Sequence, residues 1–227
     1  SDLNSAYFIP LNTEDIHVQR ALFFPWKVGI SKRLVISDLE QFVSAKTSRL
    51  IPIMENLSLD YDKVTSMAIA GNSGSGKSYA LTYFLTLLKP ISELIIVDPK
   101  FDSPSRWAKY HQVTVIHPKQ NRSKSDFVSE INEALSQSLQ LIYQRQALLY
   151  ENPNQKFKHL TIVIDEVLAL SEGTNKAIKE AFFSLLSQIA LLGRATKVHL
   201  LLVSQRFDYN SIPVSVREQL NVNIQIE

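Results

Sequence analysis

The residues with the clearest chemistry form one loop that fits the phosphate-binding pattern G-x-x-x-x-G-K-[ST] at every fixed position. Its glycines let backbone N–H groups approach a polyphosphate without obstruction by Cβ. Lys77 is expected to reach the β- and γ-phosphates of ATP, and the Ser78 hydroxyl is expected to ligate Mg²⁺. The nucleotide-binding prediction covers Gly71, Asn72, Ser73, Gly74, Ser75, Gly76, Lys77, Ser78 and Tyr79. The alternative is a flexible Gly/Ser turn before a helix.

A second pair of chemically capable residues, Asp165 and Glu166, follows the mostly apolar run 160–164. An apolar strand that ends in two acids is the Walker B pattern. Asp165 is expected to hold Mg²⁺, mostly through water, and Glu166 to orient and deprotonate the attacking water. Alone, such a run often marks only the end of a strand. Behind a complete phosphate loop, the catalytic interpretation is favoured.

Two further residues, Gln205 and Arg194, are candidates for supporting roles. Gln205 ends the next apolar run and is predicted to sense the γ-phosphate, although a plain polar strand exit gives the same pattern. Arg194 follows a predicted helix, and an arginine at a subunit edge can complete the active site of a neighbouring subunit. A solvated surface arginine is the alternative. If Arg194 does not act in this way, Arg206 is the next candidate.

The elements that must position these residues alternate between strand and helix from about residue 49. A buried strand at 66–70 precedes the loop and an apolar helix at 79–89 follows it, which is the context that the motif needs. Further strands are predicted at 93–97, 113–116, 160–164 and 198–203, and helices at 103–110, 126–151 and 175–192, with Gly193 breaking the last helix. This alternation predicts an α/β fold with a mostly parallel central sheet flanked by helices.

Residues 1–48 are predicted to form a lead-in segment or small subdomain, and residues 49–227 the main domain. Within the first part, 33–36 is predicted to be a strand, and Asp38 to cap a short helix that runs to Ala45. The chain begins Ser-Asp without Met and ends on the strand-like run 221–226. We therefore expect it to be a piece of a longer protein.

Composition excludes several classes of function. The chain has no cysteine, which excludes disulfides, thiol catalysis and Cys-zinc sites and fits a cytoplasmic setting. No apolar run approaches the ~18 residues that span a bilayer. The net charge of +2 is too small to indicate nucleic-acid binding by itself. A local basic cluster of Lys119, Arg122 and Lys124 either contacts phosphates or forms a solvated turn.

From Ala190 to Arg206 the sequence resembles the signature of the FtsK/SpoIIIE family of DNA-pumping ATPases, G-R-A-x-x-I-H-L-[IL]-x-A-[TS]-Q-R-P. The phosphate loop, the run 96–100 in the family's I-D-P-K position and the run 164–166 also agree. The resemblance covers about residues 50 to 227. It implies a RecA-like P-loop motor that uses ATP and Mg²⁺, assembles as a homo-oligomeric, hexameric ring around double-stranded DNA and pumps it.

The sequence also departs from the family pattern. Phe207 replaces the proline that usually follows Gln-Arg, and residues 1–50 do not resemble the family's motor. Family members include chromosome segregation motors, coupling proteins of conjugative elements and type VII secretion ATPases, and some are tethered to the membrane. The divergent front end favours a conjugative or mobile-element transfer protein. The alternative is a secretion or assembly ATPase that moves protein.

Overall fold

The structure is a computed structural model of the chain, and it describes residues 7–10, 20–23, 33–45, 49–171, 173–205 and 212–226. The chain divides into two compact units, one made of Ser1–Val35 with Pro52–Ser58, and the other of Ile36–Ile51 with Leu59–Glu227. The first unit contains a two-stranded antiparallel sheet of β1 (Tyr7–Pro10) and β2 (Arg20–Phe23). The strands β3 (Leu50–Met54) and β4 (Leu57–Asp60) form another two-stranded sheet.

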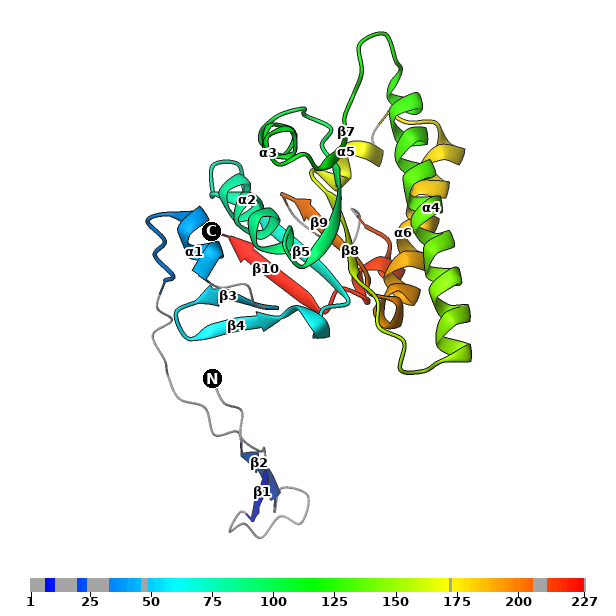
Figure 1. The fold of residues 1–227 in the computed structure, drawn as a ribbon. Helices are drawn as coiled ribbons and strands as arrows, with labels where there is room; N and C mark the ends of the chain where they lie inside the picture. The colour runs from blue at the N-terminus through cyan, green and yellow to red at the C-terminus, as the bar shows by residue number, and fades with distance from the viewer. Residues whose placement is uncertain are drawn as a thin grey trace. The chain divides into compact units, whose positions relative to one another are not determined.

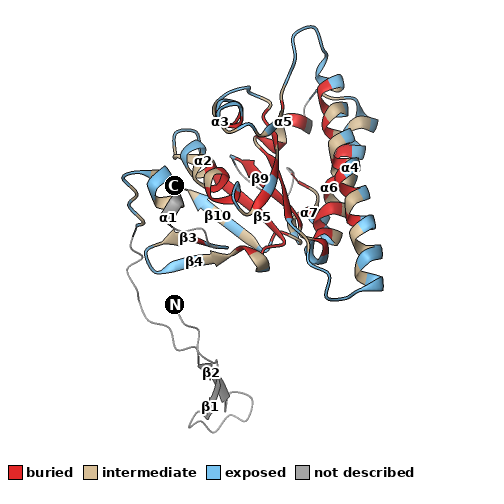
Figure 2. Ribbon diagram, viewed as in Figure 1, coloured by how far each residue is buried: buried red, intermediate tan, exposed pale blue. Residues whose placement is uncertain are grey.

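The second unit is organised around a six-stranded parallel sheet in the order β10-β5-β9-β8-β6-β7 (Figure 1). The strands are β5 (Ser66–Gly71), β6 (Ser92–Val97), β7 (Thr114–Ile116), β8 (His159–Ile164), β9 (Val198–Ser204) and β10 (Val222–Ile226). Every residue of β5, β8 and β9 is buried (Figure 2), as expected of parallel strands that are covered on both faces. This sheet confirms the predicted α/β fold.

Helices cover the sheet. The long helices α4 (Lys124–Glu151) and α6 (Lys176–Thr196) pack side by side, and their inward stripes are buried while their outer faces are exposed (Figure 2). The other helices are α1 (Leu39–Ala45), α2 (Lys77–Leu88), α3 (Ser103–His111), α5 (Val167–Ser171), α7 (Val214–Arg217) and the 3-10 turn η2 (Tyr61–Lys63). No helix in the described part of the chain is long and apolar enough to cross a membrane.

Two sequence predictions about these elements are wrong. Residues 33–36 have no regular secondary structure, and Val35 is 86% exposed, because this short apolar run is not buried in a sheet. Gly193 does not break α6, which continues to Thr196. The glycine is needed because a Cβ at this position would clash with the carbonyl oxygen of Val198, where the chain turns back into β9. The helix ends instead at Lys197, which adopts the left-handed conformation with φ 58°.

The capping prediction for α1 is confirmed, because Asp38 Oδ1 accepts a hydrogen bond of 2.9 Å from the backbone N–H of Gln41.

The order of the strands determines where the predicted site residues lie. The phosphate-loop strand β5 and the strand β8 that carries Asp165 are separated by β9 alone. Since all three strands are parallel, their carboxyl ends meet at one edge of the sheet.

Candidate nucleotide-binding site

The phosphate loop joins the carboxyl end of β5 to α2. Gly74 and Gly76 have φ angles of 82° and 97°, which lie in the left-handed region that favours glycine. Gly76 is the N-cap of α2, and it has no side chain that could accept a hydrogen bond from the first N–H groups of the helix. Free N–H groups and the positive end of the helix dipole form an anion-binding site.

The ammonium of Lys77 lies across the mouth of this loop. Its Nζ is 3.3 Å from the carbonyl oxygen of Gly71 and also 3.3 Å from Oε1 of Glu166. The side chains of Lys77 and Glu166 are 11% and 10% exposed, so water screens this ion pair only weakly. The structure therefore brings together two residues, one from each predicted motif, that are 89 positions apart in the chain.

A second cation, which the sequence analysis did not assign to the site, contacts the same carboxylate oxygen. Lys100, in the loop after β6, places its Nζ 2.8 Å from Oε1 of Glu166. Burial alone would raise the pKa of Glu166, but the hydrogen bond from Lys100 and the charge of Lys77 outweigh it and lower this pKa. The hydrogen bond with Glu166 in turn raises the pKa of Lys100. Both shifts favour the charged forms of Glu166 and Lys100 at neutral pH.

Asp165, which precedes Glu166 in the chain, lies in an environment that disfavours its ionised form. Burial and the nearby charges of Glu166 and Asp98 raise its pKa to about 6. A carboxylate that resists ionisation because acids crowd it gains from a bound cation, and Mg²⁺ is usually held by one or two carboxylates together with substrate phosphates. Ser78, in the first turn of α2, is exposed. The residues present fit a nucleotide with Mg²⁺ at this edge.

The other predicted residues are placed as follows. Gln205 comes directly after β9 and is exposed, at the edge of the sheet where the loop and Glu166 lie. Tyr79 is 86% exposed. Arg194 is exposed in the last turn of α6, which leads into the amino end of β9, so the structure does not bring it to Lys77 and Glu166 of its own chain. Arg206 lies outside the described residues.

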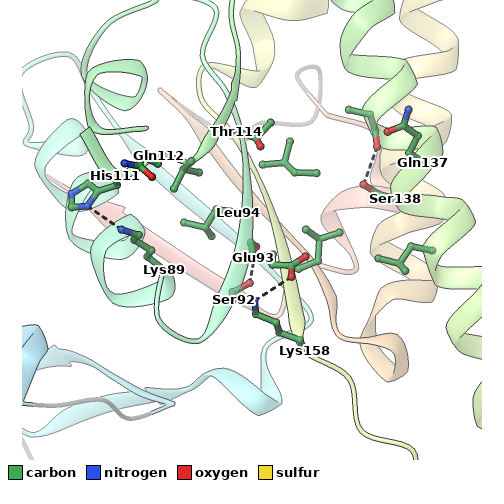
Figure 3. Close-up of a pocket in the computed structure, with 15 residues that line it drawn as sticks. Lys89, Ser92, Glu93, Leu94, His111, Gln112, Thr114, Gln137, Ser138 and Lys158 are labelled. Carbon is green, nitrogen blue, oxygen red and sulfur yellow. Dashed lines mark hydrogen bonds and ion pairs between the residues drawn. The ribbon is translucent and has the colours of Figure 1, made fainter. Parts of the chain in front are cut away.

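Two cavities lie away from the phosphate loop. One, of about 600 Å³, is lined in part by the amino-terminal half of β6 (Figure 3), and its lining includes Lys89, Glu93, His111, Gln137 and Lys158. In it Lys89 Nζ is 3.4 Å from His111 Nδ1, and Lys158 pairs with Glu93 at 3.1 Å. The other cavity, of about 290 Å³, includes Lys119 and Arg122 in its lining.

The basic cluster near the second cavity is charge-paired. Lys119 and Arg122 both contact Glu130, at 2.6 Å and 3.4 Å. The three side chains are between 28% and 54% exposed. These pairs favour a solvated turn over a set of free phosphate contacts.

Residues 62–211 match the family described as AAA domain. The Bacillus subtilis (strain 168) "Ftsk domain-containing protein YdcQ" is 25% identical over 190 residues, which are 78% of this chain and 37% of that protein.

Among solved structures, the pCW3 conjugation coupling protein TcpA, in its monomer form with ATPgS, is similar with a TM-score of 0.68 at 20% identity. The match covers 96% of this chain and 64% of that one. The cytoplasmic domain of the Thermomonospora curvata Type VII Secretion ATPase EccC is similar with a TM-score of 0.54 at 23% identity, over 74% of this chain and 22% of that one. These similarities confirm the predicted RecA-like P-loop fold.

Proposed function

The chain belongs to the AAA domain family. We propose that it is a motor domain that couples ATP hydrolysis to movement of double-stranded DNA. The match to an FtsK domain-containing protein confirms the FtsK/SpoIIIE resemblance predicted from the sequence. The chain is therefore a P-loop ATPase domain of this type. Residues 49–227 form the motor in this proposal, and residues 1–48 lead into it.

The observation that carries the proposal is the convergence of Lys77 and Glu166 beside the uncapped N-terminus of α2. The loop N–H groups and Lys77 would bind the β- and γ-phosphates, and Ser78 with Asp165 would hold Mg²⁺. Bound Mg²⁺ supplies positive charge to the phosphate oxygens. Glu166, kept ionised by its two lysines, would accept a proton from the attacking water. Gln205 would sense the γ-phosphate.

Two observations support DNA as the cargo. The run from Ala190 to Arg206 resembles the signature of DNA-pumping motors. The similar structure TcpA is described as a conjugation coupling protein. We expect double-stranded DNA to increase the rate of ATP hydrolysis, and a steady-state assay with and without duplex DNA measures this. A protein-secretion ATPase is expected to be indifferent to DNA, so an unchanged rate would favour that alternative.

Arg194 has a distinct place in the proposal, as an arginine finger that acts on the neighbouring subunit of a homo-oligomeric, hexameric ring. Its exposed position in the last turn of α6, which leads into the amino end of β9, supports action in trans rather than within its own chain. Arg194→Ala is expected to leave the ATP affinity of a single chain unchanged and to lower turnover in the ring on the order of 10³-fold.

Mixing Arg194→Ala with Lys77→Ala tests the finger directly, because each variant supplies the half-site that the other lacks. Recovery of DNA-stimulated hydrolysis in the mixture supports a shared site. If mixed rings form and stay inactive, or if Arg194→Ala alone hydrolyses ATP normally, the assignment fails and Arg206 becomes the candidate.

A further inference from the structure

The two oxygens of the Glu166 carboxylate have different surroundings. Oε1 accepts hydrogen bonds from both Lys100, at 2.8 Å, and Lys77, at 3.3 Å. Among the described residues, Oε2 has no hydrogen-bond partner. Glu166 also has a φ angle of 45°, in the left-handed region that is unfavourable for a residue with a side chain. The described contacts that hold the carboxylate are therefore all made through Oε1.

One of these two contacts is needed elsewhere when ATP binds. Lys77 is the P-loop lysine, and in the proposed function it contacts the β- and γ-phosphates. Of the two lysines that contact Oε1, only Lys100 then remains to donate a hydrogen bond to it. Its side chain is 57% exposed, so its shaft contributes little to the core.

The backbone that carries Lys100 is fixed by a buried acid. Asp98 is fully buried, and its Oδ1 accepts a hydrogen bond of 3.0 Å from the N–H of Lys100. Its Oδ2 accepts hydrogen bonds from the N–H of Asp102 and from both the N–H and the hydroxyl of Ser105, at 2.8, 3.1 and 2.6 Å. Asp98 is not the N-cap residue of α3, but its carboxylate accepts the hydrogen bonds of N–H groups at the start of that helix. It also holds the turn that carries Lys100.

We propose that Lys100 is a positioning residue for ATP hydrolysis, which holds Oε1 of Glu166 so that Oε2 stays free and aligned to accept the proton from water. The inference rests on the proposed ATPase function. Asp98, Lys100 and Glu166 then form a relay in which one group orients the next, as the buried acid orients the base in other catalytic sets. Lys100 acts through Glu166 and makes no contact with the nucleotide.

The test compares Lys100→Met, which removes the charge and keeps most of the shaft, with Lys100→Arg, which restores a donor. Lys100→Met is expected to lower kcat by roughly tenfold to hundredfold, since misplacement of a catalytic group has effects of this order. Its affinities for ATPγS and ADP should stay within about twofold of wild type, because the variant keeps the contacts that bind the nucleotide. Lys100→Arg should recover most of the lost rate. Lys109→Met, which removes an exposed lysine of α3, is the matched control.

A double-variant cycle separates action through Glu166 from other roles. In the Glu166→Gln background, Lys100→Met is expected to have almost no further effect on the single-turnover rate. The proposal is overturned if Lys100→Met keeps the wild-type kcat, if ATPγS affinity falls with kcat, if Lys100→Arg fails to recover activity, or if the two effects multiply. Absence of hydrolysis in both wild type and Lys109→Met would instead refute the proposed ATPase function, and the Lys100 role with it. Melting temperatures equal to that of wild type show that each variant is folded.

Discussion

Polar side chains form one cluster at the carboxyl edge of the six-stranded sheet and another at its amino edge, and the two clusters are built differently. The carboxyl-edge cluster consists of Lys77, Lys100, Asp165 and Glu166, where burial and the charges of neighbouring acids raise the pKa of Asp165. Nearby, the buried hydroxyl of Ser204 has no hydrogen-bond partner among the described residues. This end therefore combines charged groups, a perturbed pKa and an unpaired buried hydroxyl, a combination that is common at functional sites.

The amino-edge cluster consists of Tyr61, Asp62, His159, Thr161 and His199. His159 Nδ1 is 2.8 Å from His199 Nε2, and His159 Nε2 is 3.0 Å from Asp62 Oδ1. The ring of Tyr61 packs against both imidazoles, with centroid distances of 5.3 and 5.0 Å. Its hydroxyl is 2.5 Å from Thr161 Oγ1. Each side chain here has a partner, so this cluster joins η2 to β8 and β9 and stabilises the fold.

The comparison predicts that changes at the two clusters have separable effects, and the largest effect is on turnover. Lys77→Ala is expected to abolish tight ATP binding, because the loop loses its cation facing the phosphates. Glu166→Gln is expected to bind ATP and to hydrolyse it on the order of 10³-fold more slowly, since the amide cannot take a proton. Nucleotide-binding and turnover assays on both variants measure this. Normal turnover in Glu166→Gln would refute its assignment as base.

The next largest effect is expected at the opposite end of the sheet, and on stability. In Gly193→Ala the new methyl group would clash with the Val198 carbonyl at the start of β9. We expect the free energy of unfolding to fall by about 3 kcal/mol, because backbone on both sides must move. Urea denaturation measures this, with exposed Ala195→Gly as a control that should lose about 1 kcal/mol from helix propensity. Equal losses in the two variants would contradict the close-approach explanation.

A third test uses pH. Burial and the neighbouring His159 lower the pKa of His199 to about 4, whereas an unfolded histidine titrates near 6.5. Between these values the unfolded state binds more protons, so stability falls as the pH falls. From pH 7 to pH 5 the loss attributable to this ring is about 2 kcal/mol. Urea denaturation at both pH values should show a smaller loss for His199→Gln, and the same loss in both proteins would contradict the prediction.

The parts of the site that were predictable from the sequence are those where the chemistry is local. The phosphate loop and the pair Asp165 and Glu166 are each contiguous, so residue type and spacing were enough to predict them. The structure brings Lys77 and Glu166 together, and their roles in hydrolysis stay predictions. The contact of Lys100 with Glu166 was not predictable in this way, because it depends on β6 lying next to β8, and strand order is set by packing over the whole sheet.

The fold shows the same limit. Long periodic segments such as α4 and the buried parallel strands were predicted correctly, since burial imposes their patterns. Gly193 was misread because a glycine can serve close packing inside a helix as well as end one. Residues 33–36 were misread because a short apolar run becomes a strand only where a sheet edge accepts it. The roles of Gln205 and Arg194 stay predictions.

The smallest expected effect comes from a single oxygen of the amino-edge cluster, and it tests whether that cluster is fully paired. Tyr61→Phe removes the hydroxyl near Thr161 Oγ1, but Thr161 keeps the hydroxyl of Ser92 at 2.7 Å. No buried group is orphaned, so the free energy of unfolding should fall by only about 1 kcal/mol.

Thr161→Val should have the larger effect of the two. Burial raises the pKa of Tyr61, so its phenol keeps its hydrogen and needs an acceptor, and this variant removes the acceptor from a fully buried hydroxyl. A loss of about 2–3 kcal/mol is expected, because an unsatisfied buried donor is more costly than an absent one. Urea denaturation of both variants gives the comparison, and neither should change ATP turnover, since the cluster lies at the other end of the strands. A greater loss for Tyr61→Phe than for Thr161→Val would show that the tyrosine hydroxyl satisfies a further group, and that the amino-edge cluster is larger than these five residues.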